Sequence, residues 1–227
     1  MLKERLTRLT SSRKLSRPAH GSSDAALVVG LGNPGPQYAH TRHNMGRVVV
    51  EDLAGRFAVD LRMSRRFQGR FGRGEALGRG VFLLLPETYM NRSGSSVVKV
   101  LNYFQIPLDR VLVVHDEVAY EPGKSRLKFG GGTNGHKGLI DTIRSLGGQR
   151  EFARLRIGVG HPGAREEVVP FLTRTSMPPE ERERAIESAN LSDELVELIL
   201  AGKWCQAMNV FNAGPVEHRT EPDKSSG

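Results

Sequence analysis

The sequence lacks the features that build two large classes of protein. It contains one cysteine, Cys205, among 227 residues, which excludes an intrachain disulfide and a zinc site made of cysteines. No apolar run approaches the ~18 residues that a membrane-spanning helix needs. Acidic residues are also in short supply, since 25 Asp and Glu face 33 Lys and Arg for a net charge of +8. This balance favours a polyanionic partner, nucleic acid above all, over a merely solvated basic surface.

The two ends of the chain differ in composition from the part between them. Residues 1–26 are rich in Ser, Thr, Lys and Arg, carry about half of the net charge and have no secretory apolar core. They predict a flexible basic leader, either an organellar transit peptide or a plain basic tail on a bacterial protein. Residues 213–227 are polar and without periodicity, which predicts a disordered tail. We therefore expect one folded domain over residues 27–212, in the cytoplasm unless the leader directs import.

Short apolar runs alternate with helical patterns through this domain. Four runs are near-continuously apolar or β-branched, as strands covered on both faces are: residues 27–31, 81–85, 111–114 and 155–159. Weaker candidates are residues 67–75, as an edge strand, and 125–129. Helical spacing of apolar residues occurs in residues 46–57, 91–104, 137–146, 178–200 and 203–211. The alternation predicts a single α/β domain with a mixed, largely parallel sheet flanked by helices.

The turn after the first predicted strand matches G-x-G-x-x-G over residues 30–35, the fingerprint of a dinucleotide-binding turn. That fingerprint requires a helix that opens at the turn and an acid about 20 residues on, at the end of the next strand. Glu51 and Asp52 lie at about that distance, but they fall inside the helical pattern of residues 46–57. A helix-borne acid cannot reach a ribose at a strand end, so the sequence disfavours a nicotinamide cofactor.

A histidine and an aspartate are the leading catalytic candidates. His43 follows the glycine turn, and an imidazole titrates near pH 6.5, so it can accept a proton at neutral pH. Asp116 follows the strand of residues 111–114, at the strand end where open α/β sheets place their chemistry. The pair lacks a nucleophile, because G-x-S-x-G is absent and Cys205 falls in the helical C-terminal part. We interpret the pair as a group that activates water for hydrolysis. The alternatives are that His43 is an ordinary surface or core histidine and that Asp116 caps a turn.

Metal binding is disfavoured by spacing. His40 and His43 form only H-x-x-H, with no third ligand at a zinc spacing. A second glycine loop, GGGTNGHKG over residues 130–138, opens a predicted helix whose N–H groups could hold a phosphate or an oxyanion. His136 and Lys137 could add donors, although Gly138 after the lysine breaks the phosphate-loop pattern. The alternative is a turn without a ligand.

Polar and basic side chains elsewhere complete the candidate site. Asn91 precedes a predicted helix and offers both a donor and an acceptor that suit a peptide backbone, with helix capping as the alternative. Arg126, Lys128 and Arg156 lie on or near the strands that flank the second glycine loop, where they could clamp a phosphate. The alternative is that they are exposed strand cations without a ligand.

Five segments in order carry a resemblance to a known family. They are GLGNPG with YAHTRHN, ETYMNRSG, VVHDE, KFGGGTNGHKGL and FARLRIGVGHP. Together they closely resemble bacterial-type peptidyl-tRNA hydrolase over about residues 27–211. The resemblance implies cleavage of the ester between a peptide and the terminal ribose of tRNA, without a metal or an organic cofactor. It further implies peptidyl-tRNA as partner, no membrane association and a monomer.

The resemblance also assigns roles residue by residue. His43 would be the general base that activates water, and Asp116 would orient it and support its charged form. Asn33 and Asn91 would hold the last residue of the nascent peptide. Tyr38, Tyr89 and Met90 would line the cleft near the terminal nucleotide. His136 and Lys137 would bind substrate at the second glycine loop. Arg126, Lys128 and Arg156 would bind tRNA phosphate. The two C-terminal helices would include a lid over the cleft.

The sequence departs from the family at one important position. Where the family reads G-G-H-N-G, this chain has Lys137 in place of the asparagine that is linked to substrate binding and to positioning water or an oxyanion. A lysine can donate hydrogen bonds, but it cannot accept one while charged. The departure leaves open an alternative function, a non-catalytic RNA-binding relative like the plastid splicing factors that resemble this enzyme. The retained His43 and Asp116 favour the hydrolase.

Overall fold

The computed structural model describes residues 25–213. The predicted leader and tail therefore lie outside the described residues, apart from Ala25, Ala26 and Ala213. Ala26 already belongs to the first strand, and Ala213 ends the last helix. None of the described helices is long and apolar enough to span a membrane.

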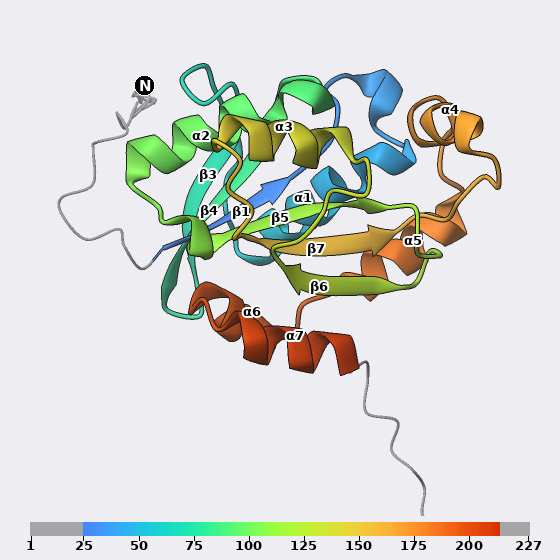
Figure 1. Cartoon of the computed structure of the whole chain (residues 1–227). Helices are drawn as coiled ribbons and strands as arrows, with labels where there is room; N and C mark the ends of the chain where they lie inside the picture. The colour runs from blue at the N-terminus through green and yellow to red at the C-terminus, as the bar shows by residue number, and fades with distance from the viewer. Residues whose placement is uncertain (1–24, 214–227) are drawn as a thin grey trace, which may run out of the picture.

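A seven-stranded sheet forms the centre of the molecule (Figure 1). Its strands, in chain order, are β1 (Ala26–Gly30), β2 (Arg62–Ser64), β3 (Gly69–Ala76), β4 (Arg79–Pro86), β5 (Val111–Glu117), β6 (Ser125–Phe129) and β7 (Ala153–Gly158). The spatial order is β2-β3-β4-β1-β5-β7-β6. The central strands β4, β1, β5 and β7 are parallel, whereas β2, β3 and β6 join antiparallel at the two sides. The mixed sheet is confirmed, but its antiparallel share is larger than the sequence indicated.

Helices cover both faces of the sheet. They are α1 (Met45–Arg56), α2 (Ser93–Phe104), α3 (Lys137–Ser145), α4 (Val168–Thr173), α5 (Pro179–Ser188), α6 (Asp193–Leu200) and α7 (Trp204–Ala213). The helices α2 and α3 pack side by side on one face, over a core that includes Leu27 and Val113. The opposite face carries α1 and α5 to α7, over a core that includes Val28 and Leu112. Neighbouring residues of a central strand thus point into different cores, which explains why these strands contain near-continuous apolar runs.

The predicted strands and helices are confirmed with three differences. Residues 67–75 correspond to β3, which is not the edge of the sheet, because the three-residue strand β2 pairs with its outer side. The predicted helix over residues 178–200 is two helices, and Ser192 begins the second by accepting a hydrogen bond from the Leu195 N–H. The short helix α4 was not predicted, because six residues that include Pro170 give too little periodicity.

Candidate active site

The segment between β1 and α1 carries both Asn33 and His43, and it is not a dinucleotide-binding turn. After the glycines it forms two single 3₁₀ turns, Pro36–Tyr38 and Arg42–Asn44, before α1 begins at Met45. No helix therefore opens at the glycines, and Glu51 and Asp52 lie within α1 as the sequence indicated. The glycines serve a turn that places Asn33 beside the ends of β1 and β4.

Asn33 is held in one orientation by its neighbours. Its backbone N–H donates to Asn44 Oδ1 at 2.8 Å, and Asn44 Nδ2 donates back to the Asn33 carbonyl at 3.0 Å. The Asn33 Oδ1 accepts the Met90 N–H at 2.8 Å, which fixes which end of the amide is the oxygen. Within the described residues no acceptor meets Asn33 Nδ2, so this N–H₂ group is free to bind a carbonyl oxygen. Asn44 is a positioning residue that only the tertiary contacts reveal.

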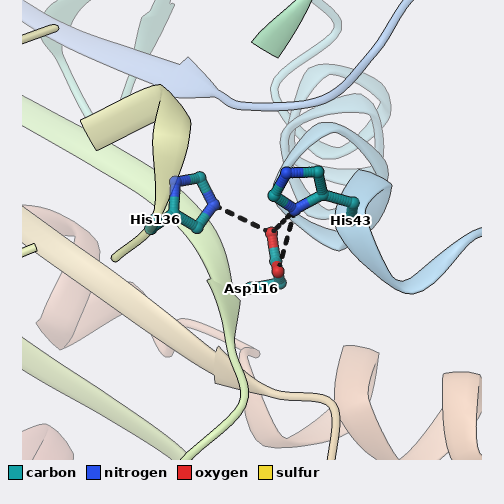
Figure 2. A group of neighbouring side chains, drawn as sticks. All are labelled: His43, Asp116 and His136. Carbon is teal, nitrogen blue, oxygen red and sulfur yellow. Dashed lines mark hydrogen bonds and ion pairs between the residues drawn. The ribbon is translucent and has the colours of Figure 1, made fainter. Parts of the chain in front are cut away.

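His43 reaches Asp116 because α1 begins close against β5. A Cβ on Gly46 would stand 2.2 Å from the Val114 carbonyl oxygen, so only glycine permits this approach. His43 Nδ1 lies 2.9 Å and 3.0 Å from the two carboxylate oxygens of Asp116 (Figure 2). Both side chains are buried. Because the carboxylate requires a donor, Nδ1 carries the proton and Nε2 is left as a base.

A second histidine contacts the same carboxylate from the opposite side. His136 Nε2 lies 3.0 Å from Asp116 Oδ1, and His136 Nδ1 accepts the Leu139 N–H at the start of α3 (Figure 2). The backbone donor requires an unprotonated Nδ1, so His136 Nε2–H donates to Asp116. Burial would raise the pKa of the Asp116 carboxyl, but His43 and His136 outweigh it and hold that pKa well below its usual range. Asp116 is therefore an anion that accepts from two imidazoles, an arrangement that sequence analysis did not predict.

A small cavity lies against this cluster. Its volume is about 120 Å³. Its lining residues come from the turn before α1, the end of β5, the second glycine loop and α4: His43, Asp116, Glu117, Val118, Thr133, Asn134, Gly135, His136, Lys137, Val168, Val169, Leu172 and Thr173. The cavity therefore combines two imidazoles, one of which is the base His43, and the cation Lys137 with the apolar side chains of α4. Such a site can hold a water molecule and an ester while keeping bulk solvent away.

The turn that carries His43 is also anchored from outside the cavity. Arg42 forms a 2.7 Å ion pair with Glu181 of α5, and its Nε donates to the Val159 carbonyl at 3.2 Å. Its guanidinium stacks over the Phe171 ring of α4, 4.0 Å from the centroid. Arg42 thus connects the catalytic turn to α4 and α5. In the sequence, only the position of Arg42 next to His43 indicated that it belongs to the site.

The residues that the resemblance assigns to the peptide and to the terminal nucleotide differ in how far they are exposed. Tyr89 and Asn91 are exposed, and Tyr38 is half-buried, so all three can contact a ligand. Met90 is 3% exposed and belongs to the core; a Cβ on Gly138 would stand 2.5 Å from its sulfur. We therefore interpret Met90 as a support for the start of α3, not as a contact for a nucleotide.

The resemblance places a lid in the two C-terminal helices, whereas the cavity is lined by α4. The two predicted helices correspond to α5, α6 and α7, and none of the described lining residues belongs to them. The helix α7 packs instead on β6, where the Leu127 N–H donates to Asn212 Oδ1 at 3.0 Å and Asn212 Nδ2 donates to the Leu127 carbonyl at 2.9 Å. The C-terminal helices thus extend the core beneath the sheet (Figure 1).

The predicted phosphate-binding cations share one face of the sheet but differ in their partners. Arg126 of β6 pairs across from Arg156 of β7, and Lys128 pairs across from Arg154. Arg126 donates to the Asn212 carbonyl of α7. Arg156 binds Glu117, whereas Lys128 is exposed. Arg154, which sequence analysis did not select, completes the set.

A buried histidine beside the cluster gives a testable pH dependence. Burial, followed by the charge of His136, lowers the pKa of His115 from 6.5 to about 3. Between pH 6.5 and pH 3, His115 is therefore protonated in the unfolded chain and neutral in the folded chain. The free energy of unfolding consequently falls as the pH drops below 6.5. We expect the His115 contribution to cost about 2 kcal/mol of unfolding free energy between pH 7 and pH 5. Urea unfolding at both pH values measures it, and His115→Gln should show a shallower pH dependence. An equal dependence in both proteins would contradict the prediction.

Three residues that could ligate a metal ion lie close together, but they are not the pair of the H-x-x-H motif, His40 and His43. His43, Asp116 and His136 offer atoms within 4.8 Å of one another. The same atoms make the hydrogen bonds described above, so a metal ion would have to displace the two imidazole protons. His40 lies apart, with its Nδ1 3.1 Å from Arg182 Nη1. That the protein works without a metal or organic cofactor stays a prediction.

The chain is similar to known proteins over most of its length. A family model described as peptidyl-tRNA hydrolase matches residues 27–221. The peptidyl-tRNA hydrolase of Saccharophagus degradans is 47% identical over 188 residues, which cover 82% of this chain and 94% of that protein. The one from Chromohalobacter salexigens is 44% identical and is covered over its whole length, by 84% of this chain. The crystal structure of peptidyl-tRNA hydrolase from Acinetobacter baumannii superposes with a TM-score of 0.79 at 43% identity, covering 86% of this chain and 98% of that one. The chain therefore belongs to the peptidyl-tRNA hydrolase family.

Proposed function

We propose that this protein hydrolyses the ester that joins a peptide to the terminal ribose of tRNA, and so releases tRNA from peptidyl-tRNA. The observation that carries the proposal is the His43–Asp116 pair, which lines a small cavity that has no serine or cysteine among its described lining residues. The family relationship supports the same reaction. The protein would then be a carboxylic ester hydrolase that uses water.

The reaction follows from the tautomer of His43. Its Nε2 takes a proton from a water molecule as the water oxygen attacks the ester carbonyl carbon. The Asp116 carboxylate stabilises the imidazolium that forms, and His136 holds the carboxylate in place. Collapse of the tetrahedral intermediate breaks the bond between the carbonyl carbon and the ribose oxygen. The ribose oxygen takes the proton back from His43 and leaves as a tRNA hydroxyl. The peptide is released as a carboxylic acid, which loses its proton to solvent and becomes a carboxylate.

Substrate binding would use the residues around Asn33. The Asn33 Nδ2 donates to a carbonyl oxygen of the peptide, and Asn91 offers a second amide close by on the turn that begins with Met90. Tyr38 and Tyr89 would contact the terminal nucleotide, because a base can stack on an exposed aromatic ring. The cationic face of β6 and β7, which includes Arg126, Lys128 and Arg156, would meet tRNA phosphate.

A deacylation assay tests the proposal. We expect N-acetyl-aminoacyl-tRNA to be hydrolysed and free aminoacyl-tRNA to be spared. His43→Ala should lower kcat about 10³-fold, because it removes the base and its ordered water. His40→Ala is the matched control, since His40 is an exposed histidine three residues away, outside the cavity, and it should leave the rate unchanged. Equal rates for wild type and His43→Ala would favour the non-catalytic RNA-binding alternative.

The position of Lys137 predicts a change in affinity and not in turnover. Lys137 is exposed, begins α3 and lines the cavity. Because His43, Asp116 and Asn33 are in place, we expect Lys137→Asn to change kcat less than about threefold. Loss of a cation should raise KM. It should also make the fall of log affinity with log salt concentration shallower, by about 1 in the slope. The same charge change at the exposed Lys99 of α2 is the control. A large gain in kcat would instead show that the native lysine impairs the site.

We expect the enzyme to act as a monomer in the cytoplasm. All the catalytic groups named above come from one chain, so the proposed reaction needs no second copy. Sedimentation equilibrium measures the mass of the protein in solution. A dimeric protein that loses its activity when it dissociates would contradict this expectation.

A further inference from the structure

A second cavity lies next to Asn33, apart from the cavity that His43 and Asp116 line. We call the two the Arg92 cavity and the catalytic cavity. The Arg92 cavity has a volume of about 340 Å³. Its walls come from the turn after β1, the β2–β3 turn and the segment that leads from β4 into α2: Pro34, Gln68, Glu87, Thr88, Tyr89, Arg92 and Ser95. None of these residues lines the catalytic cavity, so the two are separate sites.

Asn33 and Met90 stand between the two cavities. Pro34, which lines the Arg92 cavity, directly follows Asn33 in the chain. Tyr89, which also lines it, directly precedes Met90, and the Met90 N–H donates to Asn33 Oδ1 at 2.8 Å. On its other side Met90 meets the start of α3, where a Cβ on Gly138 would stand 2.5 Å from the Met90 sulfur. The second glycine loop just before Gly138 lines the catalytic cavity, so the free Asn33 Nδ2 belongs to the boundary between the two cavities.

The Arg92 cavity carries one positive charge that no described group neutralises. Glu87 and Arg92 are the two charged residues of its described lining. Glu87 forms an ion pair with Arg47, whose side chain is only 14% exposed, so the charge of Glu87 is already balanced. The exposed guanidinium of Arg92 has no hydrogen-bond or ion-pair partner within residues 25–213. An anionic group that enters the cavity can therefore bind Arg92 without breaking an existing pair.

The backbone of Arg92 is held in place although its side chain is free. The Arg92 carbonyl accepts hydrogen bonds from the Thr88 hydroxyl at 3.1 Å and from the Ser95 hydroxyl at 3.0 Å. Ser95 Oγ also lies 3.2 Å from Gln68 Oε1, and the Gln68 carbonyl accepts the Ser96 hydroxyl at 2.9 Å. These contacts join the β2–β3 turn to the start of α2. The walls of the Arg92 cavity are therefore preorganised, which lowers the entropy cost of binding a ligand.

The path of a bound peptide follows from the proposed function, on which this inference rests. In that function the ester carbonyl lies in the catalytic cavity, and the carbonyl of the preceding residue binds Asn33 Nδ2. An extended chain advances only about 3.3–3.6 Å per residue. Because the lining of the Arg92 cavity begins at Pro34, directly after Asn33, the residue that carries this second carbonyl is the first whose side chain can enter the Arg92 cavity.

We propose that the Arg92 cavity is a subsite for the side chain of the second residue from the ester, and that Arg92 makes this subsite selective for acidic side chains. A glutamate or aspartate there forms charge-assisted hydrogen bonds with the guanidinium. A lysine or arginine is repelled by Arg92 and meets a Glu87 that is already paired. Because this contact is remote from the reacting carbonyl and equal before and during the reaction, it changes KM and leaves kcat unaltered.

Three substrates that differ only at this residue test the subsite. They are N-acetyl-glutamyl-alanyl-tRNA, N-acetyl-lysyl-alanyl-tRNA and, as the reference, N-acetyl-alanyl-alanyl-tRNA. For the wild type we expect kcat/KM of the glutamyl substrate to exceed that of the lysyl substrate about 5- to 20-fold, since a partly exposed charge pair is gained in one and a repulsion in the other. The difference should reside in KM. Dividing each value by that of the reference removes any general effect of a variant.

Reversing the charge of residue 92 should reverse the preference. Arg92→Gln should bring the ratio of the glutamyl to the lysyl substrate close to one, and Arg92→Glu should favour the lysyl substrate. Lys99→Glu is the matched control, because Lys99 is an exposed cation of α2 that does not line the Arg92 cavity, and it should keep the wild-type preference. A glutamyl preference that survives in Arg92→Gln, or one that Lys99→Glu abolishes equally, would overturn the proposal.

Failure of the subsite and failure of the proposed function give different results. A wild type that hydrolyses none of the three substrates would refute the proposed function. A wild type that hydrolyses all three with equal kcat/KM, or that prefers the lysyl substrate, would refute the acid-selective subsite alone. The wild-type comparison needs no variant, so it decides against or for the subsite even if a substitution at residue 92 prevents folding.

Discussion

Asp116→Asn is expected to lower kcat for N-acetyl-aminoacyl-tRNA about 10³- to 10⁴-fold with little change in KM, as for the orienting carboxylate of serine-protease triads. The reason is that the Asp116 carboxylate accepts hydrogen bonds from two imidazoles. In the native site both carboxylate oxygens accept from His43 Nδ1, and Oδ1 also accepts from His136 Nε2. An asparagine must turn its NH₂ group towards one of these imidazoles. If His43 meets that group, its Nδ1 becomes the acceptor and the proton moves to Nε2, which can then no longer act as a base.

A matched variant separates this effect from general damage. Asp109→Asn makes the same chemical change at an exposed position just before β5, and it should leave kcat and KM unchanged. The melting temperature of Asp116→Asn checks that the site is still folded at the assay temperature. A folded Asp116→Asn protein whose kcat is within tenfold of the wild type would show that Asp116 does not control the tautomer of His43.

Much of the fold was predictable from local patterns. The strands β1, β4, β5 and β7 lie in the middle of the sheet and are covered on both faces, so each contains a near-continuous apolar run, as buried parallel strands do. The edge strand β2 has three partly or fully exposed residues and carries no such pattern. The break between α5 and α6 depends on a cap at Ser192 inside a sequence that otherwise keeps helical spacing. Elements that depend on tertiary contacts for their existence are therefore the ones that the sequence did not predict.

The site was predictable only where a motif places a residue at a strand end. His43 comes after β1 and Asp116 lies at the carboxyl end of β5, and the parallel pairing of these strands brings the two residues together. The second contact to Asp116, from His136, depends on how closely α3 approaches, which Gly138 and Met90 determine. The buried partner of Arg156, Glu117, was visible in the sequence only as the residue after Asp116. Motifs thus identify which side chains take part, while packing decides which donors remain free.

Asn33→Asp is expected to lower kcat/KM about 10²- to 10³-fold, the range for loss of one preorganised donor to a developing oxyanion. The substitution is nearly isosteric, and one carboxylate oxygen can still accept the Met90 N–H that Asn33 Oδ1 accepts at 2.8 Å. The other oxygen replaces the free Nδ2, so a donor that faces the substrate becomes an anion. Because the backbone of Asn33 stays locked to Asn44, the change reports on the side chain alone.

The distribution of this loss between the kinetic constants shows which state Asn33 binds. If its Nδ2 holds a peptide carbonyl equally before and during reaction, KM rises and kcat is preserved. If it stabilises charge that develops only in the transition state, kcat falls and KM is preserved. Asn102→Asp, the same change at an exposed position of α2, controls for the added negative charge near a polyanionic substrate. Equal kinetic constants for the two variants would remove Asn33 from the catalytic site, because the surface charge alone would then explain the loss.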